Sequence, residues 1–162
     1  MSAQSAYDDV DAIDNNALNK DFLTMTIADQ LFGIPVLQVQ DVLREQRVTK
    51  VPLAPPEVSG SLNLRGRVVT AINMRKRLGL PERTKENGGK DMSVVVEHDN
   101  ELFSLTIDKV GDVLSLPRDN FESNPATLDP LWMSVSSGIY RLENRLMVVL
   151  DVPKLLGAVQ DP

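Results

Sequence analysis

Cysteine is absent from this chain of 162 residues, and histidine occurs once, as His98. The lack of cysteine excludes disulfides, thiolate zinc sites and cysteine nucleophiles, and it fits a reducing compartment. A single histidine excludes a metal site built from a histidine cluster. We therefore expect neither a metal nor a cofactor.

Aromatic residues and positive charge are also scarce. The chain has four Phe, two Tyr and one Trp, which are too few for platforms on which nucleic-acid bases stack. Its net charge is −6. Because nucleic-acid-binding proteins usually carry a basic footprint, this composition argues against that class.

Long apolar runs are missing too, since none approaches the roughly 18 residues of a membrane span. The N-terminus carries Asp8, Asp9 and Asp11 where a signal peptide would carry positive charge. We therefore expect a soluble cytoplasmic protein that does not insert into a membrane.

The length suits one domain, or two small halves that share a core. Residues 1–20 are polar and acidic, and we expect them to form a flexible tail. Residues 21–157 hold the strand-forming segments, and residues 158–162 form a second, short tail. The polar, glycine-containing segment 81–90 is expected to link two halves, at about 21–80 and 91–157.

Alternating apolar residues predict β-strands in the first half of the chain. The expected strands are 22–27, 31–34, 48–51, 61–65 and 67–72, with a turn at 28–30 and a proline-rich loop at 52–56. A short helix follows, because Asn73 is a good N-cap and Gly79 is a good residue to end it.

The same pattern then starts again. Strands are expected over 92–97, 102–107, 110–116, 139–142 and 146–150, with a turn at 98–100 and a long polar loop at 119–130. Asp151 caps a last helix, which we expect to end at Gly157.

The restart is an internal repeat. Residues 32–43 align without a gap on residues 103–114, and residues 66–79 align in the same way on residues 144–157. Two alignments in the same order, each with the same change from strand to helix, indicate a duplicated unit. Short-stranded units of about 65 residues close most readily into barrels, which removes exposed sheet edges. The expected fold is all-β with short helices: two small β-barrels with a groove between them.

Residues that carry catalysis are poorly placed in this chain. His98 lies in a turn-like segment, and Ser136 has no base near it in the sequence. Asp108 and Asp112 are four residues apart across a strand, which is a spacing open to general acid–base chemistry. Acids at strand ends in loops are far commoner, so we expect no enzyme activity.

Some apolar residues lie where alternation along a strand exposes them. Alternation groups Val110 with Leu114 and turns Val113 outward, and it places Val39 on the face of Asp41. Exposed valines beside acids and an arginine suit a protein-contact surface. Strands that are bulged, or buried on both faces, would also explain why these valines fall on faces that alternation exposes.

Arg65 is displayed at a strand end. In segment 61–65, Leu62 and Leu64 point one way and Arg65 the other. Gly66 follows and takes a positive φ angle without steric cost, which suits a tight turn. An isolated arginine in such a place is usually just solvated, so only its context can indicate a function.

These motifs together resemble the CheW family, the bacterial chemotaxis coupling proteins. The resemblance covers residues 21–157, and the proline loop followed by NLRG is its most specific part. The motifs that carry it are FGIPVLQVQDVL (32–43), VPLAPPEVSGSLNLRG (51–66), the apolar strand and basic helix after it, IDKVGDVLSLP (107–117) and VVLDVPKLL (148–156).

The resemblance implies two packed, five-stranded SH3-like β-barrels and no catalytic activity. Members link the cytoplasmic tips of methyl-accepting chemoreceptors to the regulatory domain of the histidine kinase CheA. A receptor helix lies in the groove between the barrels, and its contact positions fall here on Val39, Asp41, Arg65, Val110 and Val113. This implies a cytoplasmic adaptor that is recruited to membrane-associated receptor arrays.

The chain departs from the family pattern in two places. Asp41 stands where the family often has Glu, which keeps the charge and shortens the reach. Residues 70–75 (TAINMR) replace a stretch that usually carries a proline and ends in Asp-Leu-Arg. Two other functions stay open: an adaptor of a non-flagellar chemosensory array, and a small-barrel protein that binds nucleic acid.

Overall fold

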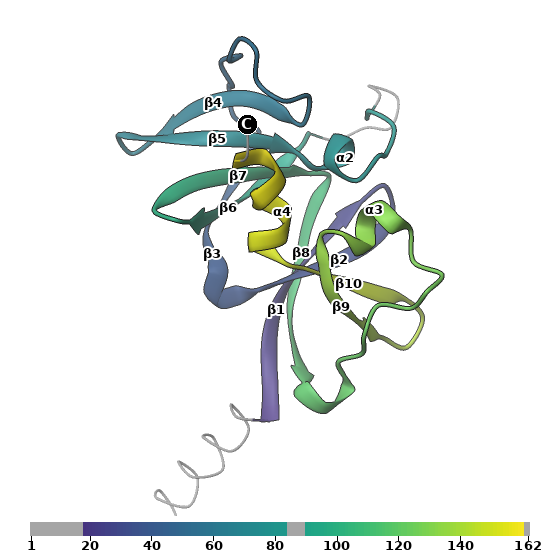
Figure 1. Ribbon diagram of the computed structural model, residues 1–162. Helices are drawn as coiled ribbons and strands as arrows, with labels where there is room; N and C mark the ends of the chain where they lie inside the picture. The colour runs from purple at the N-terminus through teal and green to yellow at the C-terminus, as the bar shows by residue number, and fades with distance from the viewer. Residues whose placement is uncertain (1–17, 84–89, 161–162) are drawn as a thin grey trace, which may run out of the picture.

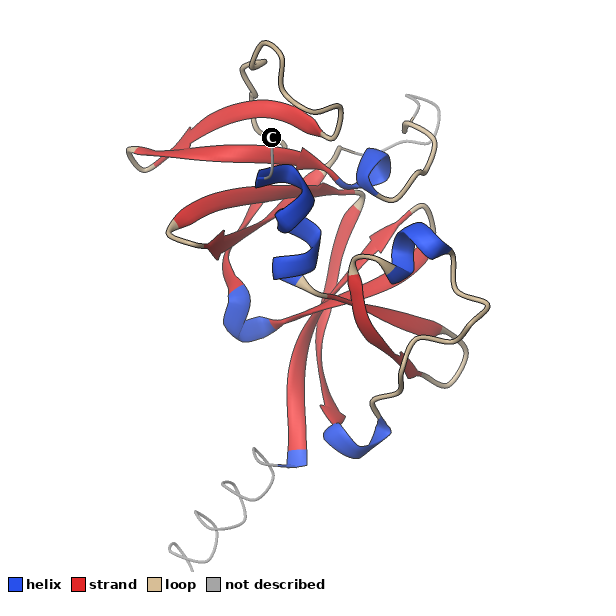
Figure 2. Ribbon diagram, viewed as in Figure 1, coloured by secondary structure: helices blue, strands red, loops and turns tan. Residues whose placement is uncertain are grey.

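The computed structural model describes residues 18–83 and 90–160, most of which are in strands (Figure 2). Residues 1–17 of the expected tail (1–20) and 84–89 of the expected linker (81–90) lie outside the described residues. Asn19 and Lys20 belong to β1, so the expected end of the tail at residue 20 is wrong. The strands are β1 (Asn19–Ile27), β2 (Gln30–Pro35), β3 (Val39–Arg44), β4 (Val58–Leu64), β5 (Arg67–Asn73), β6 (Met92–His98), β7 (Glu101–Ile107), β8 (Lys109–Pro117), β9 (Ser136–Arg141) and β10 (Leu146–Leu150). The helices are η1 (Val36–Gln38), α2 (Met74–Arg77), η3 (Arg118–Asn120), α3 (Pro130–Met133) and α4 (Val152–Gln160).

Both helix caps form as the sequence predicts. The Asn73 side chain accepts a hydrogen bond from the N–H of Lys76 (3.2 Å), and Asp151 accepts one from Lys154 (3.0 Å). Gly79 ends the α2 segment with φ +70°. Helix α4, however, continues past Gly157 to Gln160, so the expected helix end and the tail at 158–162 are wrong there.

One expected strand is missing. Residues 48–51 contribute only a single bridge, between Thr49 and Ser61. The strand expected at 61–65 begins earlier instead, because β4 starts at Val58. The proline-rich loop therefore joins β3 to β4 without a strand between them.

Each of two five-stranded sheets curls into a small barrel (Figure 1). Barrel A has the strand order β8-β1-β2-β10-β9, and barrel B has the order β3-β6-β7-β5-β4. Neighbouring strands are antiparallel except β2 with β10 and β5 with β7, which are parallel. The expected all-β fold of two packed, five-stranded barrels is confirmed.

The two barrels are copies of one arrangement. When β1–β5 are matched to β6–β10, the strand order of barrel A becomes that of barrel B. The register agrees as well, since Phe32 pairs with Val148 in barrel A and its counterpart Phe103 pairs with Thr70 in barrel B. The internal repeat of the sequence is thus visible in the strand pairing.

The hairpin turns repeat too. Ala28 and Asp29 have φ angles of 50° and 66°, and Asp99 and Asn100 have 52° and 66°. Two successive residues with positive φ form the tight turn that matches the twist of paired strands. Both turns lie where the sequence predicts them.

Each barrel combines strands from both repeats. Barrel A takes β1 and β2 from the first repeat and β8–β10 from the second, whereas barrel B takes β3–β5 and β6–β7. The expected division into barrels at about 21–80 and 91–157 is therefore wrong. Local patterns show where strands lie, but the partner of a hairpin is set by contacts distant in the sequence.

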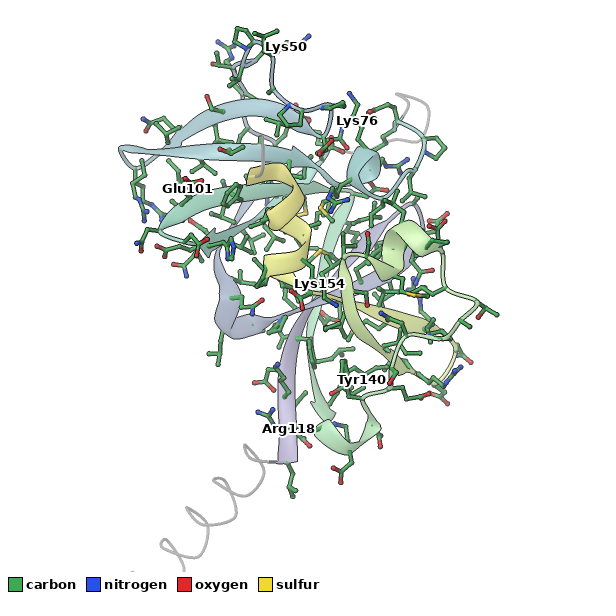
Figure 3. All side chains as sticks on the ribbon, in the orientation of Figure 1. Lys50, Lys76, Glu101, Arg118, Tyr140 and Lys154 are labelled. Carbon is green, nitrogen blue, oxygen red and sulfur yellow. The ribbon has the colours of Figure 1, made fainter. Side chains whose placement is uncertain are left out.

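One hydrophobic cluster joins the two barrels. It contains Met25 and Phe32 from barrel A and Val96 and Phe103 from barrel B. The opposite face of each sheet has a cluster of its own. These are Phe22, Leu31, Tyr140, Met147 and Val149 in barrel A, where Figure 3 labels Tyr140, and Leu62, Val69, Ala71, Val95 and Leu102 in barrel B. Because side chains alternate along a strand, each sheet gives one face to the shared cluster and the other to its own interior.

Helical segments tie the barrels together. Helix α4, yellow in Figure 1, lies between them and buries Leu155 and Leu156 in the shared cluster. From α3, the indole N–H of Trp132 donates to the carbonyl oxygen of Leu78 (2.9 Å). The Trp132 ring lies 5.4 Å from that of Phe32. This packing fixes how the barrels sit against each other.

Candidate functional site

Strand β3 is an edge strand of barrel B, and a bulge divides it. Val39 pairs with Val96 and Asp41 pairs with Val95, so Gln40 is an extra residue in this strand. Val95 and Val96 point to opposite faces, and cross-strand partners share a face. Val39 and Asp41 therefore lie on opposite faces, and the expectation that they share one is wrong.

Strand β8, the edge strand of barrel A, has the matching irregularity. Val110 pairs with Met25 and Val113 pairs with Leu23, and both partners belong to the shared cluster. Val113 is 55% exposed, as expected for an outward residue. Leu114 pairs with Phe22 on the other face, so the expected grouping of Val110 with Leu114 is wrong.

Valines occupy equivalent places on the two edge strands. Val39 and Val110 are partners in the repeat, and each packs against the shared cluster. Val42 is the repeat partner of Val113, pairs with Val94 of that cluster and is 38% exposed. Four valines thus border the junction between the barrels. Val42 was not among the expected contact residues, although the repeat alignment places it on Val113.

Arg65 lies within the turn between β4 and β5. Arg65 and Gly66 have φ angles of 51° and 84°, and the Asn63 side chain accepts a hydrogen bond from the Gly66 N–H (3.0 Å). The strand therefore ends at Leu64, one residue earlier than expected. The turn leaves the Arg65 side chain 77% exposed.

An ion pair joins two of the expected contact residues. Arg65 Nη2 lies 2.9 Å from Asp41 Oδ2, and the other carboxylate oxygen of Asp41 accepts a hydrogen bond from the Val42 N–H (2.8 Å). The pair borders a cavity of about 130 Å³ that Val95 and Leu102 also line. Both of these belong to the interior cluster of barrel B. The ion pair therefore lies on the side of β3 opposite to Val39.

The five expected contact residues thus form two groups. Val39, Val110 and Val113 lie on the faces that meet at the junction of the barrels, and Asp41 and Arg65 lie at the opening of barrel B. Strand β3 connects the groups, because it carries Val39 on one face and Asp41 on the other.

A second ion pair spans the barrels. The Arg75 guanidinium donates two hydrogen bonds to the Asp108 carboxylate (Nε to Oδ1, 2.9 Å; Nη2 to Oδ2, 2.6 Å), which also accepts from the Ala28 N–H (2.9 Å). Arg75 belongs to α2, and Ala28 to the turn between β1 and β2. The pair therefore fastens the end of barrel B to the first hairpin of barrel A.

The electrostatics of Asp108 follow from this position. Burial by itself would raise the pKa of Asp108, but hydrogen bonds from Arg75 and Ala28, with the charges of Arg75 and Arg83, lower this pKa below its ordinary value. The same hydrogen-bonded pair raises the pKa of Arg75. A carboxylate held ionised in this way suits a structural ion pair rather than a general acid.

Other kinds of site find little support. Within residues 18–83 and 90–160, no three His, Cys, Asp or Glu side chains come together to hold a metal ion. None of the helices in the same described ranges is long and apolar enough to cross a membrane. Val42 (38% exposed) and Val113 (55% exposed) on the edge strands, with the exposed Arg65, remain as candidate contact residues.

Comparisons with known proteins agree with this fold. The family model described as CheW-like domain matches residues 21–160. The chain is similar to chemotaxis protein CheW of Treponema pallidum (27% identity; 84% of this chain and 81% of that protein) and of Bacillus subtilis (30%; 77% and 79%). Its fold is similar to the crystal structure of scaffolding protein TtCheW from Thermoanaerobacter tengcongensis (TM-score 0.73, 24% identity; 83% of this chain and 90% of that chain). The chain therefore belongs to the CheW family of chemotaxis scaffold proteins.

Proposed function

We propose that this protein couples chemoreceptors to a CheA-type histidine kinase in membrane-associated signalling arrays. The receptor would contribute an amphipathic helix from its cytoplasmic tip, and the kinase its regulatory domain. Membership of the CheW family supports both partners.

The paired valines of the two edge strands carry the proposal. Val39 and Val42 on β3, with Val110 and Val113 on β8, border the junction on faces that both pack against the shared cluster. An amphipathic helix placed along this junction would bury its apolar stripe against both pairs. Exposed apolar residues arranged in this way favour a protein partner over water.

Arg65 supplies the polar part of the proposed contact. A guanidinium has five N–H donors, and the ion pair with Asp41 engages one nitrogen of Arg65. The remaining donors suit a carboxylate or a main-chain carbonyl of the receptor helix. Asp41 would hold the guanidinium in place for that contact.

Binding of a chemoreceptor cytoplasmic fragment from the same organism tests the proposal. Val113→Asp places a charge on the valine surface, and we expect the affinity for the receptor to fall about 10- to 100-fold. Arg65→Ala should also weaken binding. Isothermal titration calorimetry measures both effects.

Val51→Asp is the matched control. Val51 is 45% exposed, close to the 55% of Val113, but lies in the loop between β3 and β4. It should bind the receptor like the unaltered protein. Each variant should still bind the kinase regulatory domain. Unchanged receptor affinity of Val113→Asp would contradict the assignment of this surface.

A further inference from the structure

The interior of barrel B contains a polar cavity away from the proposed receptor surface. It measures about 180 Å³, and its wall includes the hydroxyls of Ser59, Ser93, Ser104 and Thr106. Ser93 pairs with Thr106 across β6 and β7, so these two hydroxyl residues share one face. A cavity of this size is much larger than a single water needs.

Barrel A shows how the same space is filled when no cavity is kept. Phe22 is the repeat partner of Ser93, and Tyr140 is that of Leu62. The two rings lie 5.3 Å apart in the interior cluster. Gly33 is the partner of Ser104, and a Cβ atom there would lie 2.7 Å from the sulfur of Met147. The shared backbone therefore does not require an open space, and the side chains of barrel B create it.

Ser104 indicates that the cavity takes a hydrogen-bonding occupant. The side chain is fully buried, at 0% exposure, and its Oγ has no hydrogen-bond partner among the described residues. Ser104 pairs with Val95 on one side and Ala71 on the other, and neither of these apolar side chains can form a hydrogen bond with the Ser104 hydroxyl. Buried hydroxyls are normally hydrogen-bonded, so an unpaired one calls for a partner.

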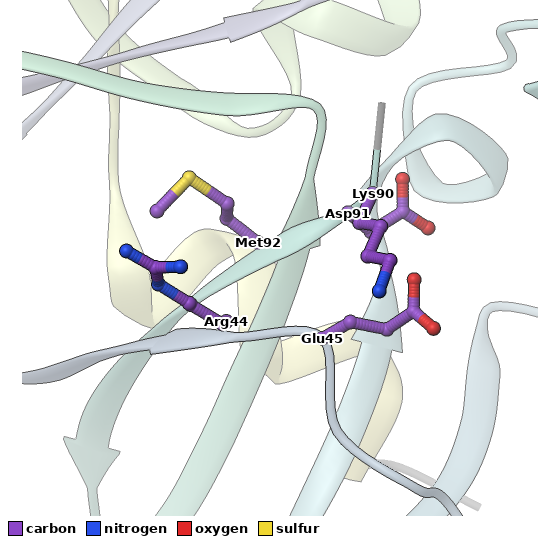
Figure 4. Close-up of a pocket in the computed structure, with 5 residues that line it drawn as sticks. All are labelled: Arg44, Glu45, Lys90, Asp91 and Met92. Carbon is purple, nitrogen blue, oxygen red and sulfur yellow. The ribbon is translucent and has the colours of Figure 1, made fainter. Parts of the chain in front are cut away.

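The charged residues that line the cavity itself are acidic. Of the described residues that line it, the two that carry charge are Glu45 and Asp91. Asp91 pairs with Arg83 (2.9 Å), which leaves Glu45 as the acid available to a ligand. These acids also line an adjoining pocket of about 420 Å³ with Arg44, Lys90 and Met92 (Figure 4). In that view the Lys90 and Glu45 side chains point toward each other.

We propose that the cavity of barrel B binds a small organic ammonium ion. Its N–H groups would donate to the Glu45 carboxylate, and its body would lie among the hydroxyls of Ser93, Ser104 and Thr106. Hydroxyl oxygens and a carboxylate are acceptors for such a cation, whereas an anion would be repelled by the Glu45 carboxylate. The proposal is independent of receptor binding.

A titration of the full chain, labelled with ¹⁵N, tests the proposal by NMR. Ethylammonium chloride is the probe, and ethanol and sodium acetate of similar size are the comparisons, all at constant ionic strength. We expect saturable shifts at the amides of Ser93, Ser104 and Thr106 with ethylammonium alone. The absence of saturable shifts means that the cavity holds water only and overturns the proposal. Equal shifts with ethanol overturn the role of charge.

Two variants distinguish specific binding of ethylammonium in the cavity from nonspecific attraction of cations to an acidic protein. Glu45→Gln should lower the affinity for ethylammonium about 10- to 100-fold, because it removes a charge-assisted hydrogen bond. Glu101→Gln, an exposed acid at the start of β7, is the matched control and should change nothing. Equal losses in both variants contradict a specific site.

Filling the cavity gives a second test. Ser93→Phe installs the side chain of barrel A and should abolish the saturable shifts. If this variant does not fold, Ser104→Ala serves instead, since it removes one hydroxyl without adding volume. It should weaken binding about fivefold. Unchanged affinity of a folded Ser104→Ala protein shows that the hydroxyl faces no ligand.

Discussion

The two barrels share strand order, register and the β1–β2 and β6–β7 turn conformation, yet their interiors differ. Barrel A is packed with the rings of Phe22 and Tyr140, whereas barrel B has Ser93 and Leu62 in the same places and keeps a cavity. Duplication explains what the barrels have in common. The positions at which they differ therefore need an explanation of their own, and these are the positions to look at for function.

The segments that connect the strands also differ between the two barrels. The segment between β8 and β9 contains α3 and folds back on the protein, with Leu128 buried. The segment between β3 and β4 extends away, and Leu53 at φ +62° is fully exposed. The segment between β8 and β9 thus packs against the shared cluster, whereas Leu53 of the β3–β4 loop is exposed to solvent.

The charges at the two openings differ as well. Barrel B has the Asp41–Arg65 ion pair. The repeat partners of these residues in barrel A are Asp112 and Glu143, which are both acidic, so the ion pair cannot form there. The β9–β10 turn of barrel A therefore carries an acid where the β4–β5 turn of barrel B carries Arg65.

The largest effect is expected from making the interior of barrel A like that of barrel B. Phe22→Ser introduces the residue found at Ser93. Because Phe22 is 2% exposed, the free energy of unfolding should fall by about 3–5 kcal/mol. Urea denaturation followed by circular dichroism measures the change. Phe121→Ser, at an aromatic residue that is 41% exposed, is the control and should cost about 1 kcal/mol. Equal losses would show that barrel A does not depend on its filled interior.

An intermediate effect is expected where the barrels are fastened to each other. Asp108→Asn removes the ionised partner of Arg75, and the free energy of unfolding at pH 7 should fall by about 1–3 kcal/mol. Asp112→Asn, four residues along and exposed, should have little effect. If the two variants are equally stable, the Arg75–Asp108 pair does not hold the barrels.

The same pair predicts a dependence on pH. The folded state lowers the pKa of Asp108, so its ionised form stabilises the fold above the unfolded value of about 3.9. This contribution is lost as the pH falls through the lower, folded pKa. The stability difference between the unaltered protein and Asp108→Asn should be constant from about pH 5 to 7 and shrink below roughly pH 4. A difference that persists at low pH would show that charge is not its source.

The smallest effects are expected at the openings of the barrels. Asp41→Asn and Arg65→Gln, combined in a double-mutant cycle, should give a coupling of about 0.2–1 kcal/mol because Arg65 is exposed. Glu143→Arg gives barrel A a basic residue opposite Asp112 and should change the stability by less than about 1 kcal/mol. A much larger coupling would mean that the ion pair serves the fold rather than a partner.

Much of this architecture could be predicted from the sequence, because strand alternation, turn residues and helix caps act locally. The hairpin turns and the Asn73 and Asp151 caps are examples. The pairing of β1 with β8 could not be predicted, since nothing near Asn19 specifies a partner almost a hundred residues away.

The residues of the candidate site were expected from the family resemblance, and alternation along the strands did not predict their arrangement. A single extra residue, Gln40, reverses the face of every side chain after it, so the alternation that groups Val39 with Asp41 fails. The repeat alignment would have found Val42. The cavity of barrel B has no local signal, because it depends on serines from separate strands that meet only when the sheet curls.

The exchange of hairpins between the two repeats has a consequence for the origin of the chain. A single repeat contains β1–β5 but lacks the hairpin β6–β7 that completes barrel B, and its own hairpin completes the other barrel. A half-length ancestor would have built these two barrels only as a pair of identical molecules that traded hairpins. Joining the two copies in one chain would place both halves of that symmetric pair in one molecule, in which each half can change without the other.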